Sequence, residues 1–212
     1  GKGGGINDAT DESWGPKLDG RLIPQFFSNG EPAPFVAHPD NVKNFFETGH
    51  TRTTGVSVSG SNDKIDYRFS FNNSKQTGVI PNTDISKNSF GVNTTFRLNE
   101  KLTLTTSANF ARNSSDNLPG TSGRGSSVML QFLWFGRQVD TELLKDYNKG
   151  GFDYNWNHSY YSNPYLLQYE NTAQQRRDRF FGNVNLSYKI TDWLTATVRT
   201  GNDYYNDKRK FK

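Results

Sequence analysis

The sequence FGVNTTFRL at residues 90–98 alternates mostly apolar side chains with polar or small ones in period two. Successive residues of a β-strand point to opposite faces of a sheet, so this pattern predicts a strand with one apolar face and one hydrated face. Five further stretches alternate in the same way: residues 54–59, 65–72, 102–110, 183–190 and 194–199. We therefore expect six strands.

The connections between these strands fall into two classes. Short polar turns at residues 60–63, 99–101 and 191–193 join strands as hairpins, whereas the other connections cover about residues 75–87 and 113–178. Short turns at one end of the strands and long loops at the other are typical of barrels in the bacterial outer membrane, with the turns periplasmic and the loops extracellular. The expected fold is an all-β, antiparallel portion of a transmembrane β-barrel whose long extracellular loops contain short helices.

A sheet of six strands has two open edges, which a lipid bilayer does not tolerate because unpaired backbone groups are costly there. We therefore expect further polypeptide to close the barrel, and the chain to be part of a larger one. Its expected division is an extracellular loop segment at 1–50, four strands within 51–112, a long extracellular loop at 113–178, and two strands within 179–212.

Composition excludes several other classes of protein. The chain has no cysteine, so it forms neither disulfides nor thiolate metal sites. Its net charge of +4 comes from dispersed basic residues, with one local cluster at residues 176–179, and this does not predict a nucleic-acid-binding surface. His38, His50 and His158 are isolated in the sequence, and no nucleophile motif occurs. We expect no enzyme activity and no cofactor.

The long connection at 113–178 is the expected functional region. Apolar residues recur with helical spacing between residues 126 and 147, and tyrosine, tryptophan and asparagine crowd residues 154–169. Aromatic and amide side chains together suit the capture of sugars or peptides, but they equally suit a small core within the loop. The candidate contacts to a substrate or to a lid protein are Trp134, Arg137, Trp156, Tyr160, Tyr161 and Tyr165.

Several phrases of the sequence resemble the SusC/RagA family of TonB-linked outer-membrane proteins. They are ESWGPKLDG at 12–20, HPDNVKNFFETG at 38–49, VSVSG at 56–60, GVIPNTD at 78–84, WFGRQVD at 134–140 and YNWNHSYYSNPY at 154–165. The resemblance implies a barrel of about 22 strands with an N-terminal plug. It also implies TonB-driven import of glycan fragments or peptides beneath a SusD-like lipoprotein lid, with the plug and the TonB-contacting segment outside this chain.

Two alternatives to the importer are a passive porin-like barrel and a soluble β-sandwich that binds carbohydrate. The sandwich predicts that the apolar faces meet a second sheet and bury Tyr67, Phe69, Phe96 and Tyr188. The barrel predicts that these side chains face outward to lipid. It places on the opposite, inward face Arg68, Arg97, Lys189 and Arg199.

Overall fold

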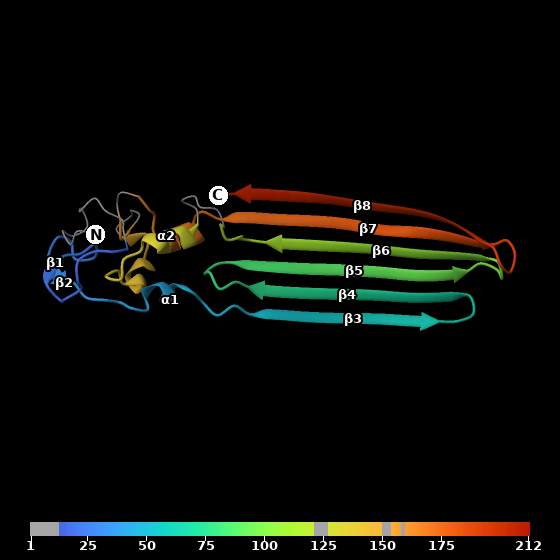
Figure 1. Ribbon diagram of the computed structural model, residues 1–212, viewed down its shortest axis with the longest axis horizontal. Coiled ribbons are helices and arrows are strands. Elements are labelled where there is room, and N and C mark those ends of the chain that lie inside the picture. The colour runs from blue at the N-terminus through green and yellow to red at the C-terminus, as the bar shows by residue number, and fades with distance from the viewer. Residues whose placement is uncertain (1–12, 121–126, 150–153, 158–159) are drawn as a thin grey trace.

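A computed structural model describes residues 13–120, 127–149, 154–157 and 160–212 of the chain. Six of its strands form one antiparallel sheet in which each strand pairs with its neighbours in chain order (Figure 1). They are β3 (Thr51–Ser61), β4 (Ile65–Thr77), β5 (Asp84–Arg97), β6 (Leu102–Ser115), β7 (Ala173–Lys189) and β8 (Thr195–Phe211). The fold is all-β and antiparallel.

The connections are sorted between the two ends of the sheet. Residues 62–64, 98–101 and 190–194 make short turns at one end, which we call the turn end. In the first two turns the side chain of Asn62 or Asn99 accepts hydrogen bonds from the last backbone N–H of the turn and the first of the next strand, at 2.9 Å. This Asx-type turn reverses the chain within a few residues. All longer connections lie at the other end, the loop end (Figure 1).

The strand register assigns every strand side chain to one of two faces. We call one of them the apolar face. On it, one large side chain from each of the strands β3 to β8 lies in a single row across the sheet. The first is a valine and the other five are aromatic. The row consists of Val56, Phe71, Phe90, Phe110, Phe180 and Tyr204. We call its five rings the aromatic row. From this row to the turn end, no position on the apolar face of the described strands carries a charged side chain.

The opposite, polar face carries serine, threonine, asparagine and charged residues. Arg68, Arg97 and Arg199 all lie on it, as does Lys189. The Arg97 guanidinium binds Asp66 of the same face and donates to the Asn62 carbonyl at 3.2 Å. These four basic residues therefore lie on the face opposite to Phe69 and Tyr188, as a barrel wall requires.

A β-sandwich is excluded for the part of the chain that the structure describes. Of the four side chains that a sandwich would bury, Phe69 and Tyr188 are 43% and 47% exposed, and Tyr67 and Phe96 are half-buried by their neighbours in the same sheet. The other sheet formed by the described residues is the small pair β1 (Leu22–Pro24) and β2 (Pro32–Pro34), which lies beyond the loop end and away from the apolar face (Figure 1).

A compact body of loops lies beyond the loop end of the sheet (Figure 1). We call it the loop body: the described residues of 13–49 and 116–172, which include α1 (Asn41–Phe45), α2 (Val128–Trp134), the 3-10 helix η1 (Thr141–Leu144) and α3 (Pro164–Tyr169). Its core is aromatic and aliphatic: Phe45, Val128, Phe135, Val139, Leu144, Trp156, Tyr165 and Leu167. This core is the most buried apolar part of the described molecule.

The elements differ from the expected ones mainly at the loop end. β6 continues to Ser115 and β7 begins at Ala173, so the connection between them is shorter than the predicted 113–178. The predicted helices between residues 126 and 147 are α2 and η1. The short helix α1 has Asp40 at its N-cap position, but the Asp40 side chain makes no capping hydrogen bond.

Candidate functional site

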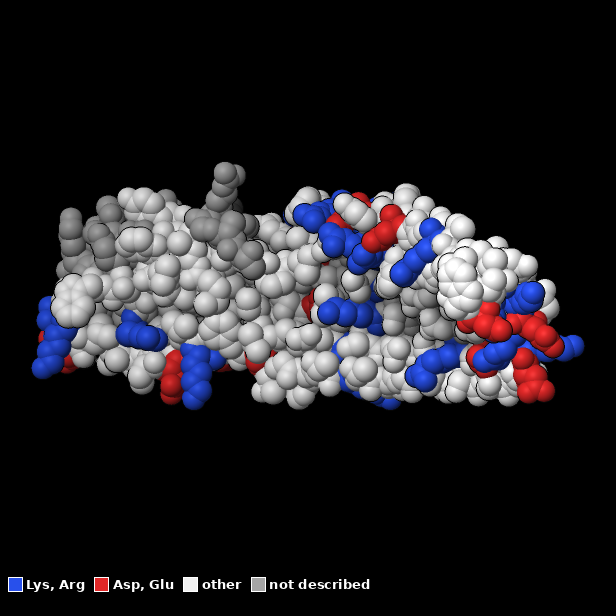
Figure 2. All heavy atoms as spheres, turned by 45° about the vertical axis from the view of Figure 1, so that its right-hand side comes forward, with Lys and Arg blue, Asp and Glu red and all other residues white. Residues whose placement is uncertain are grey.

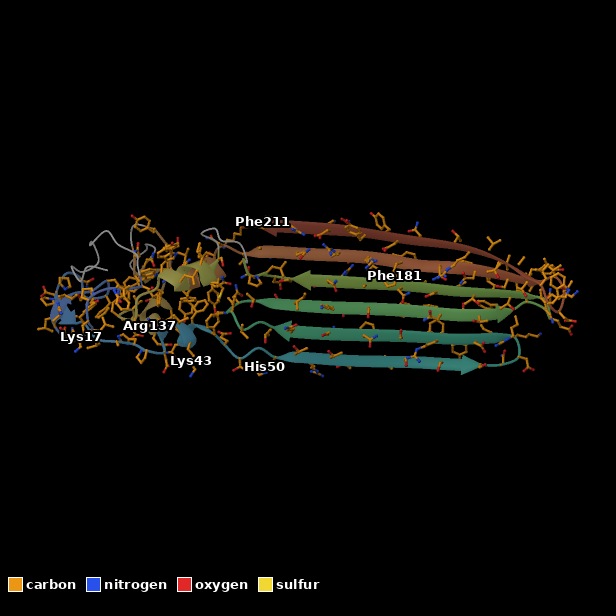
Figure 3. All side chains as sticks on the ribbon, viewed as in Figure 1. Lys17, Lys43, His50, Arg137, Phe181 and Phe211 are labelled. Atoms are coloured by element: carbon orange, nitrogen blue, oxygen red, sulfur yellow. The ribbon has the colours of Figure 1, made fainter. Side chains whose placement is uncertain are left out.

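The polar face of β7 and β8 carries a cluster of charged and aromatic side chains near the loop end. It consists of Arg177, Arg179 and Phe181 on β7 and of Asp203, Tyr205 and Asp207 on β8, and we call it the Arg–Asp cluster. These residues occupy alternate positions of two paired strands, so period two brings all six side chains to one surface. Phe181 is seen on its strand in Figure 3.

Two ion pairs organise the cluster. Arg179 donates from Nε and Nη2 to the two carboxylate oxygens of Asp203, at 2.8 and 2.5 Å. Arg177 donates from the same two atoms to one oxygen of Asp207, at 3.0 and 2.5 Å. Each guanidinium also lies over a ring, Arg179 at 5.0 Å from the centre of Phe181 and Arg177 at 5.6 Å from that of Tyr205. At these distances the rings attract the guanidinium groups through cation–π interactions.

The Arg179–Asp203 pair contributes little to stability, because both side chains are 49% exposed and water screens their charges. Their charges therefore remain available to a ligand that offers a carboxylate to the guanidinium or an ammonium group to the aspartate. Lys and Arg gather with Asp and Glu over the sheet in the view of Figure 2, whereas the loop body seen there is mostly uncharged.

Two adjoining hollows lie along the cluster. One, of about 490 Å³, is lined by five members of the cluster together with Ala111 and Asn113 of β6. The other, of about 460 Å³, lies further toward the turn end and shares Phe181 and Asp203 with the first. It is also lined by Asn109, Asn183 and Arg199. Together they form a trough with cations, carboxylates, amides and two aromatic rings.

The aromatic candidates in the long loop separate into buried and exposed side chains. Trp156 and Tyr165 belong to the core of the loop body, and Tyr161 is partly buried against Trp156, with ring centres 6.3 Å apart. Burial raises the pKa of Tyr165 far above its usual range, which keeps its hydroxyl neutral. Tyr160, at 62%, and Trp134, at 38%, are exposed to solvent. Of the six candidates, these two present accessible aromatic surface.

Arg137 joins the two segments of the loop body. Its Nη1 donates to the side-chain oxygen of Asn41 at 2.8 Å, and its carbonyl accepts from the His38 N–H at 2.7 Å. The Asn41 amide nitrogen in turn donates to the carbonyls of Gly136 and Val139, both at 2.9 Å. Arg137 lies in the loop body in Figure 3. These bonds hold α1 against the segment between α2 and η1.

The asparagines of the loop body bind its own backbone. Asn163 is fully buried, and its amide nitrogen donates to the carbonyls of Leu144 and Tyr154 at 2.8 and 2.7 Å. Its oxygen accepts from the N–H groups of Tyr165 and Leu166, which caps α3. Buried loop carbonyls need such partners because no strand or helix supplies one. These amides therefore stabilise the irregular backbone.

Glu170 is one of the residues that tie the loop body to the end of the sheet. Glu170, at the end of α3, accepts a hydrogen bond from Tyr147 and one from Lys212, which follows β8, both at 3.0 Å. The hydrogen bond from Lys212 and that from Tyr147 hold the pKa of this carboxyl below its usual range.

The structure shows no cluster of metal-ligating side chains among the described residues; His158 lies outside them. No helix in the described part of the chain has the length and hydropathy needed to cross a membrane. The Arg–Asp cluster was only partly visible in the sequence. The run of arginines at 176–179 was a signal, but its acidic partners are 24 and 30 residues away, on the next strand.

The six-stranded sheet, with one apolar and one hydrated face and every long connection at one end, has the fold of a stretch of β-barrel wall. Among solved structures, the chain is similar to the RagAB peptide importer in the "open-open" state, with a TM-score of 0.60 and 19% sequence identity. The match covers 80% of this chain and 19% of the other, so this chain spans about a fifth of the length of the importer chain. No protein-family model and no curated protein matches the sequence.

Proposed function

We propose that this chain is part of the wall of a TonB-dependent importer of the SusC/RagA type in the bacterial outer membrane. The observation that carries the proposal is the division of the sheet into an uncharged apolar face and a polar face with the Arg–Asp cluster. The apolar face turns toward lipid, and the polar face lines the lumen. Further strands pair with the two edge strands, β3 and β8, to complete the barrel.

The length of the apolar band suits a membrane. On β7 it extends from Phe180 to Tyr188 and continues to Ile190 in the turn. The ten residue-to-residue steps from Phe180 to Ile190 measure about 34 Å in extended chain, or about 26 Å along the membrane normal at the usual strand tilt of about 40°. Outer-membrane barrels have an apolar band of about 25 Å. The aromatic row then marks the boundary with the headgroups at the loop end, which faces the outside of the cell.

Peptides are the proposed substrates, and the chain takes part in their transport rather than in catalysis. Ionised termini and charged side chains of a peptide would exchange with the partners in the exposed pair Arg179–Asp203. A peptide carboxylate would also reach the Arg177 guanidinium, which is 44% exposed, whereas its partner Asp207 is 16% exposed and also accepts from Gln175. The rings of Phe181 and Tyr205 would hold apolar side chains. A neutral glycan fragment would use the rings and amides of the trough but not its charges. The structural likeness to a peptide importer supports the same choice.

The loop body would meet the lid. We propose that a SusD-like lipoprotein contacts its exposed aromatic side chains, Trp134 and Tyr160, since exposed aromatic residues are frequent anchors of interfaces. TonB would act through a plug domain outside this chain.

Uptake of charged oligopeptides by cells that depend on the complete barrel tests this function. The double substitution Arg177→Gln and Arg179→Gln removes both guanidinium charges from the trough and should lower uptake about tenfold. Arg68→Gln, on the polar face of β4 and outside both hollows, is the matched control and should leave uptake unchanged. Barrel assembly, measured by heat-dependent gel mobility, should be the same in all three.

Two further experiments test the alternatives, a passive porin and an importer of neutral glycans. A protonophore should abolish uptake, because TonB-dependent import needs the proton gradient of the inner membrane, whereas a passive porin would continue to conduct. Uptake of neutral oligosaccharides but not of peptides by the wild type would contradict the proposed substrate. Peptide uptake that survives deletion of the barrel would overturn the proposed function itself.

A further inference from the structure

The apolar face changes character just beyond the aromatic row. The next row toward the loop end is polar and contains Asn73, Asn88, Arg112 and Asp178. Asn73 donates to Asn88 at 2.7 Å, and Arg112 donates to Asp178 at 2.6 Å while its guanidinium lies over the ring of Phe110. This row therefore begins a polar zone on the same side of the sheet as the apolar band.

The following row is strongly basic. It consists of Arg52, Lys75, Ser86, Ser114, Arg176 and Lys208, one residue from each of the six strands in register, and we call it the cationic row. Arg52, Lys75 and Lys208 form no ion pair within the described residues. Arg176 shares Asp178 with Arg112. Three of the four cations are therefore not neutralised by any ion pair among the described residues.

Charge on the apolar face is confined to this end. Beyond the aromatic row the described strands place on it six cations, Arg52, Lys75, Arg112, Arg176, Lys208 and Lys210, and two anions, Asp84 and Asp178. If these cations served only solubility, they would not need to begin directly at the edge of the apolar band. Its position indicates a partner that lies against the same edge.

A hollow of about 500 Å³ lies across part of the cationic row. Arg52, Lys75 and the hydroxyl residues Ser86 and Ser114 line it, together with His50 and two carboxylates, Asp84 and Asp116. The Asp84 carboxylate already accepts a hydrogen bond from the Asp116 N–H at 2.9 Å. Two cations beside two hydroxyl groups are a suitable set of donors for a phosphate group, which offers three strong acceptor oxygens.

We propose that the cationic row, with Arg112, binds the phosphate groups of lipid headgroups in the outer leaflet of the membrane. This rests on the proposed placement in the outer membrane. Arg112 lies about 7 Å and Lys75 about 13 Å beyond the aromatic row along their strands, or about 5 and 10 Å along the membrane normal. Flexible lysine and arginine side chains reach from there into the headgroup layer. Electrostatic attraction of such residues to anionic lipid adds to burial of the apolar band.

Retention of lipid by the purified complete barrel tests the proposal. The probes are lipid A with two phosphates, the same lipid after enzymatic removal of both phosphates, and inorganic phosphate alone, with bound lipid counted by native mass spectrometry. The wild type should retain the phosphorylated lipid about tenfold better than the dephosphorylated one. The double variant Arg52→Gln and Lys75→Gln should lose that preference.

The matched control is Lys64→Gln with Lys101→Gln, which removes two cations from turns at the opposite end of the sheet. It should keep the preference for phosphorylated lipid. Equal retention of both lipids by the wild type, or an unchanged preference in the double variant, would overturn the proposal. Displacement of the lipid by millimolar inorganic phosphate would show a site for free phosphate instead. Peptide uptake and barrel assembly, measured in parallel, report on the proposed function separately, because neither needs these two cations.

Discussion

Replacing Leu186 by arginine should strongly impair assembly of the barrel. Leu186 lies on β7 in the middle of the apolar band, faces away from the polar trough and is 41% exposed in this chain. In the membrane that exposed surface would meet hydrocarbon. An arginine at this depth costs about 2–4 kcal/mol on the lipid face of a barrel. We expect loss of the heat-modifiable folded band and a lower urea midpoint for the fraction that folds in lipid vesicles.

The neighbouring residue supplies the control. Asn185 lies on the same strand but on the polar face, where its amide donates to Asn183 at 3.0 Å. Asn185→Arg adds the same charge and the same bulk one position away, in a hydrated lumen. It should assemble normally and lose less than about 1 kcal/mol of stability. Equal assembly of the two variants would contradict the assignment of the apolar face to lipid.

The second large effect is expected in the loop body, where Phe45→Ala should unfold the packing between α1 and α3. Phe45 is 1% exposed, and the centres of the Phe132 and Tyr165 rings lie 4.9 and 5.0 Å from its own. Truncation of a buried phenylalanine costs about 3–5 kcal/mol, since it leaves a cavity as well as lost apolar contact. Limited proteolysis should then cleave the loop body, while the sheet stays intact in the membrane.

Leu133→Ala on α2 is the corresponding control. Its side chain is 69% exposed, so its truncation removes apolar surface from the same body without opening a cavity. Proteolysis of this variant should match that of the wild type. If Phe45→Ala were equally resistant, the loop body would not depend on the core that the structure shows.

The alternation of apolar and polar residues predicts the strands well where one face of the sheet is apolar. It does not predict their full length where both faces are polar. On β8 the pattern is clear at residues 194–199, because Leu194, Ala196 and Val198 share one face. Further along the strand both faces carry polar residues, and Tyr204 and Tyr205 are adjacent rings on opposite faces. The sequence therefore shows no alternation of apolar and polar residues in this part of the strand. The strand nevertheless continues to Phe211, because its backbone pairs with β7.

The Arg–Asp cluster on the polar face could be predicted only in part from the sequence, for a related reason. Arg179 meets Asp203 only because the register of β7 on β8 is fixed, and that register depends on the whole hairpin. The loop residues were easier to notice, since aromatic residues and asparagines crowd together there. Their prediction left open whether they bind ligand or pack on one another. Trp156 and Tyr165 are buried in the loop body, and Asn163 binds backbone carbonyls.

The orientation of alternate side chains relative to lipid is the most direct test of whether the sheet is part of a membrane barrel. The chain contains no cysteine, so single cysteines can be introduced and labelled with a fluorophore at adjacent positions of two strands. Val58 with Ser57 on β3 and Val198 with Thr197 on β8 are suitable pairs. Labels at Val58 and Val198 should be quenched by nitroxides on lipid acyl chains, and labels at Ser57 and Thr197 by a water-soluble quencher. If quenching did not alternate in this way, or if the two faces were reversed, the apolar face with its aromatic row would not face lipid. That result would contradict the assignment of this sheet to a barrel wall.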